Sequence, residues 1–174
     1  VQTVEHKILD DNIGYISISQ FDRVTSQQFK DAFDSLNSAN GLIIDLRNNP
    51  GGLLTTVNEI TDMLVPEGTI TYIEDKNGNR SYHSSDKNYY NKPLVILVNG
   101  NSASASEVLS GAVKDFGVGK LIGETTYGKG VVQKNGQPKT ACPPAYKMLM
   151  ADLVRQPRQA SVPGIGSNRR TACR

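Results

Sequence analysis

The chain has 174 residues, of which 37% are hydrophobic and 21% charged, and its formal net charge is +2. This length suits one domain with a sizeable core, and the small net charge gives no indication of a nucleic-acid partner. No run of 18 apolar residues is present, which argues against a membrane span, and the polar opening Val1–Glu5 does not predict a signal peptide. His6 and His83 are too far apart for a zinc motif, so we expect no metal and no cofactor.

The average charge conceals a break after Gln133. Residues 1–133 carry 11 basic and 16 acidic side chains, a net charge of −5, whereas residues 134–174 carry 8 and 1, a net charge of +7. The second part also holds five of the eight prolines and both cysteines, Cys142 and Cys173. We therefore predict a domain over 1–133 and a divergent, basic, proline-rich tail over 134–174. The two thiols either pair in an oxidising compartment or stay free.

The first part of the chain alternates strand and helix patterns. Ile13–Ser19 has period-two character and predicts a strand. Thr25–Gln28 is a capping-box pattern, which predicts a helix that ends at Asn40-Gly41. Leu42–Leu46 is almost entirely apolar, as expected of a strand covered on both faces. A second capping pattern, Thr56–Glu59, predicts the next helix.

The remaining elements continue this alternation. Thr69–Ile73 and Arg80–His83 flank a turn and predict a hairpin. Leu94–Val98 reads as a buried strand, and the helical spacing of apolar residues over Val108–Phe116 predicts a helix after it. Lys120–Gly123 predicts one more short strand. Strands that alternate with helices indicate an α/β layered domain.

Two turns follow neighbouring strands of this predicted sheet. The first contains Gly51 and Gly52, whose backbone amides can point at a bound group. The second contains Ser102, Ser104 and Ser106 at the start of a helix, where free N–H groups and the positive end of the helix dipole are available. If the two strands are parallel neighbours, both turns face one crevice. Such a place suits a negatively charged tetrahedral intermediate.

A serine nucleophile needs a base, and neither histidine is well placed for that role. The remaining candidate is Lys129, which lies between two glycines, Gly128 and Gly130. A lysine acts as a base only when its amine is neutral, which requires burial or a nearby cation.

The segments Ser102–Glu107 and Thr126–Gln133 closely resemble the carboxyl-terminal processing proteases, the S41 family of serine peptidases with a Ser/Lys dyad. The resemblance runs from about Val4 to Gln133, about three-quarters of the chain. It implies that the nucleophile is Ser104, which stands 25 residues before Lys129.

The resemblance also assigns the other site residues. Gln133, four residues after the lysine, orients the lysine side chain. The oxyanion hole uses the amide of Ala105, which follows the nucleophile, and the amide of Gly52. Ser102 and Ser106 are then capping or packing residues. Asp45 and Arg47 are interpreted as polar groups that support the Gly52 turn, and Glu107 as a carboxylate that complements the helix dipole.

Fold, substrates and location follow from the same resemblance. It implies the crotonase/ClpP-like layered core that these proteases share. It also implies cleavage near the accessible C-termini of protein or peptide substrates. A homo-oligomer is one possible assembly of the parent protein. The family is usually exported, so the parent protein is expected in the periplasm, the cell envelope or outside the cell. The peptide-binding PDZ domain that normally precedes this region is not expected within this chain.

The family pattern stops after Gln133. In place of the family's C-terminal strands, which we expect to be missing or altered, the tail shows only a short helical pattern over Tyr146–Val154. The tail is interpreted either as out-of-frame translation or another artefact, or as a natural divergent extension. Two alternatives to a peptidase are a non-catalytic core that only binds peptides and, less well supported, an acyl-thioester enzyme on the same fold. The latter would need a basic nucleotide pocket, of which residues 1–133 give no sign.

Overall fold

The computed structural model describes residues 1–74, 77–129, 131–132 and 146–150. The larger of its two sheets is made of the strands β1 (Val4–Leu9), β2 (Ile13–Ile18), β3 (Gly41–Asp45), β6 (Leu94–Val98) and β7 (Lys120–Gly123), in that order. The smaller sheet has the order β5 (Arg80–Ser85), β4 (Gly68–Glu74), β9 (Tyr146–Met150) and β8 (Val131–Val132). The helices are the 3₁₀ turn η1 (Asp10–Asn12), then α1 (Thr25–Ser35), α2 (Leu54–Asp62) and α3 (Ala105–Asp115).

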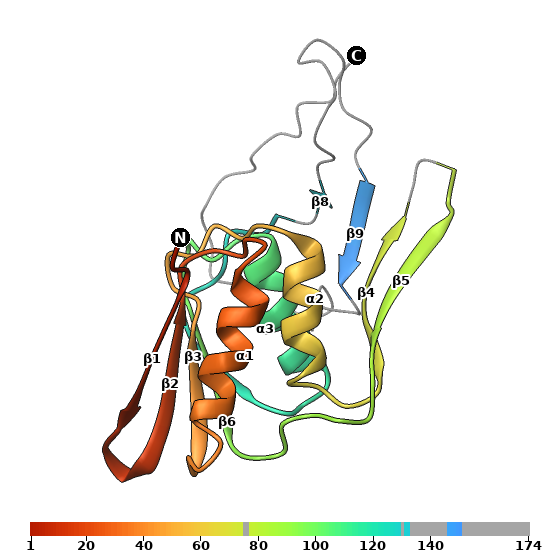
Figure 1. The fold of residues 1–174 in the computed structure, drawn as a ribbon. Coiled ribbons are helices and arrows are strands. Elements are labelled where there is room, and N and C mark those ends of the chain that lie inside the picture. Colours follow the sequence, from red (N-terminus) through yellow and green to blue (C-terminus); the bar gives the residue numbers. More distant parts are fainter. Residues whose placement is uncertain (75–76, 130, 133–145, 151–174) are drawn as a thin grey trace, which may run out of the picture.

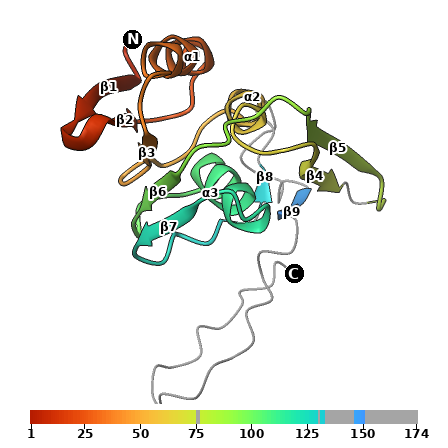
Figure 2. The ribbon, with the colours of Figure 1, turned by 90° about the horizontal axis from the view of Figure 1, so that it is seen from below.

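The elements form layers, with α2 and α3 between the two sheets and α1 beside β1 and β2 (Figures 1 and 2). Strands β2, β3, β6 and β7 are parallel, and only β1 joins the larger sheet in antiparallel orientation. Its two central strands pair Ile44 with Ile96, and both side chains are fully buried. This mixed α/β architecture confirms the predicted fold class, and the 68–85 hairpin, strand β2 and helix α3 also lie where the sequence placed them.

Both predicted capping boxes are wrong. Helix α1 has Val24 as its N-cap and helix α2 has Leu53, so Thr25 and Thr56 lie inside the helices. Both threonine hydroxyls bind the loop before α1 instead: that of Thr25 donates to the carbonyl of Gln20, and that of Thr56 to the carbonyl of Asp22. Helix α1 also ends at Ser35, before Asn40-Gly41.

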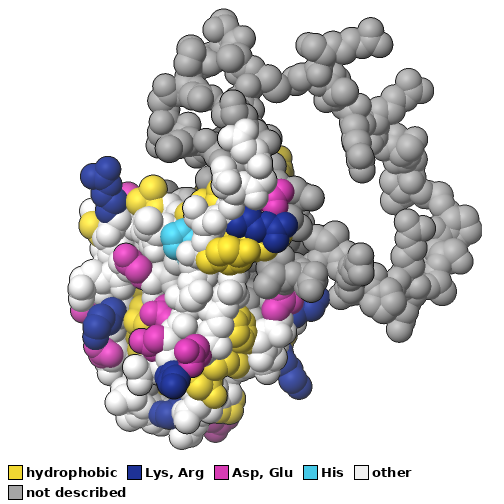
Figure 3. Space-filling view, turned by 90° about the vertical axis from the view of Figure 1, so that its right-hand side faces the viewer, with side chains coloured by type: hydrophobic (Ala, Val, Ile, Leu, Met, Phe, Trp, Pro, Cys, Tyr) yellow, Lys and Arg dark blue, Asp and Glu magenta, His cyan; other side chains and the backbone are white. Residues whose placement is uncertain are grey.

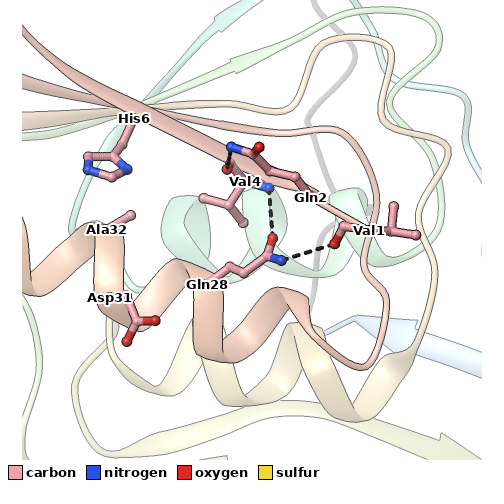
Figure 4. Close-up of a pocket in the computed structure, with 7 residues that line it drawn as sticks. All are labelled: Val1, Gln2, Val4, His6, Gln28, Asp31 and Ala32. Carbon is pink, nitrogen blue, oxygen red and sulfur yellow. Dashed lines mark hydrogen bonds between the residues drawn. The ribbon is translucent and has the colours of Figure 1, made fainter.

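The Gln28 side chain, which the capping box would direct toward Thr25, reaches the N-terminal strand (Figure 4). Its Oε1 accepts the amides of Thr3 and Val4, at 2.8 and 3.2 Å, and its Nε2 donates to the carbonyl of Val1. A long-range contact of this kind cannot be read from local sequence, and it fastens α1 to the start of β1.

The helix predicted over Tyr146–Val154 is also wrong. Tyr146–Met150 is strand β9, which pairs with β4 on one side and β8 on the other. At least one strand therefore follows Gln133. Pairing with two partner strands decided the conformation, as is common for short apolar segments. None of the helices in the described ranges is long and apolar enough to cross a membrane.

Asp45 and Arg47 pair with each other at the end of β3, and none of the hydrogen bonds described for their side chains reaches the Gly52 turn that they were predicted to support. Asp45 ends β3, is buried, and accepts hydrogen bonds from the Arg47 guanidinium and from the hydroxyl of Tyr15. Burial alone would raise the pKa of Asp45, but the hydrogen bonds from Arg47 and then Tyr15 outweigh burial and hold that pKa below its ordinary value. This carboxylate therefore stabilises the fold in its ionised form.

Replacing Tyr15 by phenylalanine is expected to lower the free energy of unfolding at pH 7 by about 1–2 kcal/mol, because a hydrogen bond to a charged group is lost. The stabilisation from a lowered carboxyl pKa is present above the ordinary value of 3.8 and disappears as pH falls through the folded-state value. Urea unfolding at pH 7 and pH 3 should thus show that Tyr15→Phe lowers the free energy of unfolding less at pH 3 than at pH 7. Tyr89→Phe is the control, and an equal Tyr15→Phe cost at both pH values would contradict this explanation.

Candidate active site

The two predicted turns meet at the carboxyl edge of the larger sheet. Strands β3 and β6 are parallel and in register, with Asp45 opposite Leu97, so the loops that follow them begin side by side. The loops are then joined directly: the amide of Ala103 donates to the carbonyl of Asn49 at 3.1 Å. The two turns are therefore direct neighbours, as was predicted from parallel strands.

Ser102 and Ser106 hold the loops together. Both are completely buried. The hydroxyl of Ser102 donates to the carbonyl of Leu46 at 2.8 Å, and that of Ser106 to the carbonyl of Asn49 at 2.9 Å. Their hydroxyls are committed to backbone carbonyls, as expected of packing residues, which leaves Ser104 as the serine of this triplet at the surface of the crevice.

Asn49 is a structural residue that the sequence analysis did not single out. Its side chain is fully buried, and its Oδ1 accepts the amide of Gly51 at 2.9 Å while its Nδ2 donates to the carbonyl of Ile18 at 2.8 Å. The first contact is an Asx turn, for which Asn followed by Pro50 and a glycine is a recognisable signal. Asn49 thereby fixes the shape of the glycine turn.

The glycine turn lies directly against Ser104. Gly51 and Gly52 have φ values of 104° and 146°, which residues with a Cβ rarely adopt. A Cβ at Gly51 would lie 2.8 Å from Cβ of Ser104 and 3.0 Å from the nitrogen of Ala105. A Cβ at Gly52 would lie 2.0 Å from the carbonyl oxygen of Phe21. The absence of side chains is what lets the two turns touch.

Ser104 is held in a strained backbone conformation, with φ 55° and ψ −111°. A non-glycine residue in such a conformation costs of order 1–3 kcal/mol and persists only where the surroundings impose it. Ser104 is half-exposed and lies at a sharp strand-to-helix turn, at the head of α3. This geometry is typical of a nucleophile elbow.

Two backbone amides remain available beside Ser104. Within the described ranges, neither the N–H of Gly52 nor that of Ala105 donates a hydrogen bond. The Ala105 amide is one of the first N–H groups of α3, which have no partner within the helix. No described residue therefore occupies either amide.

The backbone of Lys129 is tied to the same turn through Glu107. One carboxylate oxygen of Glu107 accepts the amide of Ser104 at 2.7 Å and the amide of Lys129 at 3.0 Å. The backbone of Lys129 therefore lies near that of Ser104, and the pairing of the two side chains stays a prediction. Gln133 lies outside the described residues.

The Lys129 side chain borders a hollow of about 630 Å³. The hollow is lined by Asn48, Pro50, Asn101, Ala103, Tyr127 and Lys129. Lys129 is half-buried, and no carboxylate in the described part of the chain forms an ion pair with its amine. Pro50 and Ala103 directly precede Gly51 and Ser104, so the hollow adjoins both turns. Across the described residues, no group of three or more His, Cys, Asp or Glu side chains could hold a metal ion.

A strained serine that opens a helix beside free amides is typical of serine hydrolases. The chain belongs to peptidase family S41, whose model matches residues 12–140. It is 41% identical over 137 residues to the carboxy-terminal processing protease CtpA of Bacillus subtilis, a match that covers 76% of this chain and 29% of that protein.

Two further proteins extend this comparison. The chain is 42% identical over 125 residues to a chloroplastic C-terminal processing peptidase of Tetradesmus obliquus, covering 70% of this chain and 27% of that protein. Among solved structures it resembles a photosystem II D1 C-terminal processing protease, with a TM-score of 0.75 and 32% identity over 86% of this chain and 44% of the other. The chain spans less than a third of the length of both sequence relatives.

Proposed function

We propose that this chain is the catalytic core of a serine endopeptidase that cleaves near the C-termini of protein substrates through a Ser104/Lys129 dyad. The observation that carries the proposal is the close approach of Gly51 to Ser104 and Ala105, which leaves no room for a Cβ at Gly51. The glycine turn thus lies against the strained Ser104, and the lysine segment is bound to the same serine turn, which supports the proposed site. Membership of family S41 supports the reaction type.

The proposed reaction begins with attack of the Ser104 hydroxyl oxygen on the scissile carbonyl carbon. The neutral Lys129 amine takes the hydroxyl proton, and the amides of Gly52 and Ala105 receive the negative oxygen. The C–N bond then breaks, and the lysine returns the proton to the leaving amine. A water molecule hydrolyses the resulting ester and regenerates the serine. Gln133 is proposed to hold the lysine side chain in position.

The environment of Lys129 suits this role. An adjacent carboxylate would favour the charged form of the amine, but none of the described acidic side chains forms an ion pair with it. The hollow beside Lys129 is proposed to hold the substrate residues next to the scissile bond. The relatives include bacterial and chloroplastic processing proteases, so we also propose that the parent protein works outside the cytosol.

An active-site probe tests the assignment. A fluorophosphonate is expected to modify the chain at Ser104, because only a serine with a base and an oxyanion hole reacts rapidly. Mass spectrometry of the labelled peptide identifies the serine, and denatured protein is the control. Labelling of a different serine would refute the assignment. A chain that is neither labelled nor hydrolyses peptides, but binds them in fluorescence anisotropy, would instead be a binding module.

A further inference from the structure

Glu107 collects four hydrogen-bond donors from two separate segments. Its Oε1 accepts the hydroxyl of Thr126 at 2.9 Å and the amide of Gly128 at 2.6 Å. Its Oε2 accepts the amides of Ser104 at 2.7 Å and Lys129 at 3.0 Å. The residue lies in the first turn of α3 and is only 6% exposed. All four partners donate, so the site fits an ionised carboxylate, which only accepts.

We infer that Glu107 is the positioning residue that fixes the lysine segment, residues 126–129, against the Ser104 turn. The segment follows β7 and reaches α3 largely through these contacts and one backbone bond, from the amide of Tyr127 to the carbonyl of Ser102. Charge-assisted hydrogen bonds of this kind are about twice as strong as neutral ones. The catalytic meaning of this role rests on the proposed function.

Glu107 forms no ion pair with the lysine amine. Glu107 holds Lys129 by its backbone amide, and its two oxygens are each shared between two donors. An ion pair with Glu107 would keep the amine charged and unable to accept a proton. The carboxylate therefore positions the lysine without consuming the group that the proposed reaction needs.

Glu107→Gln is the sharpest test, because glutamine has nearly the same volume but turns one oxygen into an NH₂ group. An NH₂ group at the Oε2 position would face the amides of Ser104 and Lys129. At the Oε1 position it would face the amide of Gly128, while the Thr126 hydroxyl could turn to accept from it, so at least one amide faces another donor in either case. We expect kcat for a peptide substrate to fall about 100-fold, since small misplacement of a catalytic group costs that much. KM should stay within about threefold. If Glu107 only filled space, glutamine would preserve kcat.

A double-mutant cycle tests whether the loss acts through the lysine. In a Lys129→Ala background, Glu107→Gln should cost less than about threefold, because residues that act as a unit are strongly non-additive. An equal loss in both backgrounds would show that Glu107 acts independently of Lys129 and would overturn the inference.

Amide hydrogen exchange provides a readout that does not need activity. In Glu107→Gln, the amide of Gly128 or that of Lys129, whichever faces the NH₂ group, should exchange about tenfold faster or more, because it loses its acceptor. Ser110→Ala is the control, since this buried hydroxyl bonds only to carbonyls of α3 itself. Unchanged exchange at both amides would overturn the inference, even if the chain proved to have no peptidase activity.

Thr126 offers a second variant if Glu107→Gln does not fold. Thr126 is half-buried and supplies one of the four donors, so Thr126→Val removes one bond with little change in shape. We expect a fivefold to tenfold lower kcat, whereas Thr126→Ser should stay within about twofold. If wild type and Thr126→Val hydrolyse peptide equally while Ser104→Ala is inactive, this inference fails and the proposed function stands.

Discussion

Ser104→Ala is expected to reduce kcat for peptide hydrolysis by at least about 10⁴-fold. The variant removes the attacking oxygen and leaves the lysine without a proton to accept. Losses of this size follow removal of one member of a catalytic serine constellation, and a small residual rate comes from the oxyanion hole and binding. Here the residual would come from the amides of Gly52 and Ala105. A fluorogenic peptide assay with purified chain measures the effect.

Two controls make the Ser104 result interpretable. Ser84→Ala changes an exposed serine on β5, away from the crevice, and should leave the rate unchanged. Ser104→Ala should keep the unfolding midpoint close to that of the wild type, because the strained backbone position carries a Cβ in both. Hydrolysis within tenfold of the wild type would exclude Ser104 as the nucleophile.

Lys129→Ala is expected to lower kcat by about 10³-fold or more, through loss of the general base. Lys129→Arg should be equally impaired, since a guanidinium remains charged and cannot accept a proton. The arginine variant separates two roles, because a residue that served only as a positive charge near the oxyanion would tolerate arginine. The same peptide assay measures both variants.

The lysine prediction has its own control in Lys114→Ala, which removes an exposed lysine at the end of α3. Its rate should match that of the wild type. If Lys129→Ala and the wild type hydrolyse peptide at equal rates, any observed cleavage does not use the dyad, and the binding-only interpretation gains support.

Local patterns predicted most of the fold. The apolar strands around Ile44 and Ile96, the hairpin and helix α3 have strong periodicity and clear boundaries, and the structure confirms them. The juxtaposition of the two turns was also predictable, because it follows from parallel neighbouring strands. The identities of Ser104 and Lys129 came from family resemblance, and their roles in the reaction stay predictions.

What the sequence could not predict depends on distant partners. Thr25 has the right neighbours for an N-cap, yet the loop before it offers its hydroxyl a better acceptor. Strand β9 exists because β4 and β8 lie on either side of it. Glu107 looks like an ordinary acidic residue of a first helical turn, and its contacts with residues 126–128 appear only after folding.

The pairing of β3 with β6 has a consequence for how remote substitutions should behave. The glycine turn, with Gly51 and Gly52, and the Ser104 turn follow the ends of these two strands and lie directly against each other. The register of β3 against β6 therefore sets the distance between the groups that are proposed to react. A core substitution that shifts one strand against the other is therefore expected to slow the proposed reaction, although it changes the identity of no residue in the site.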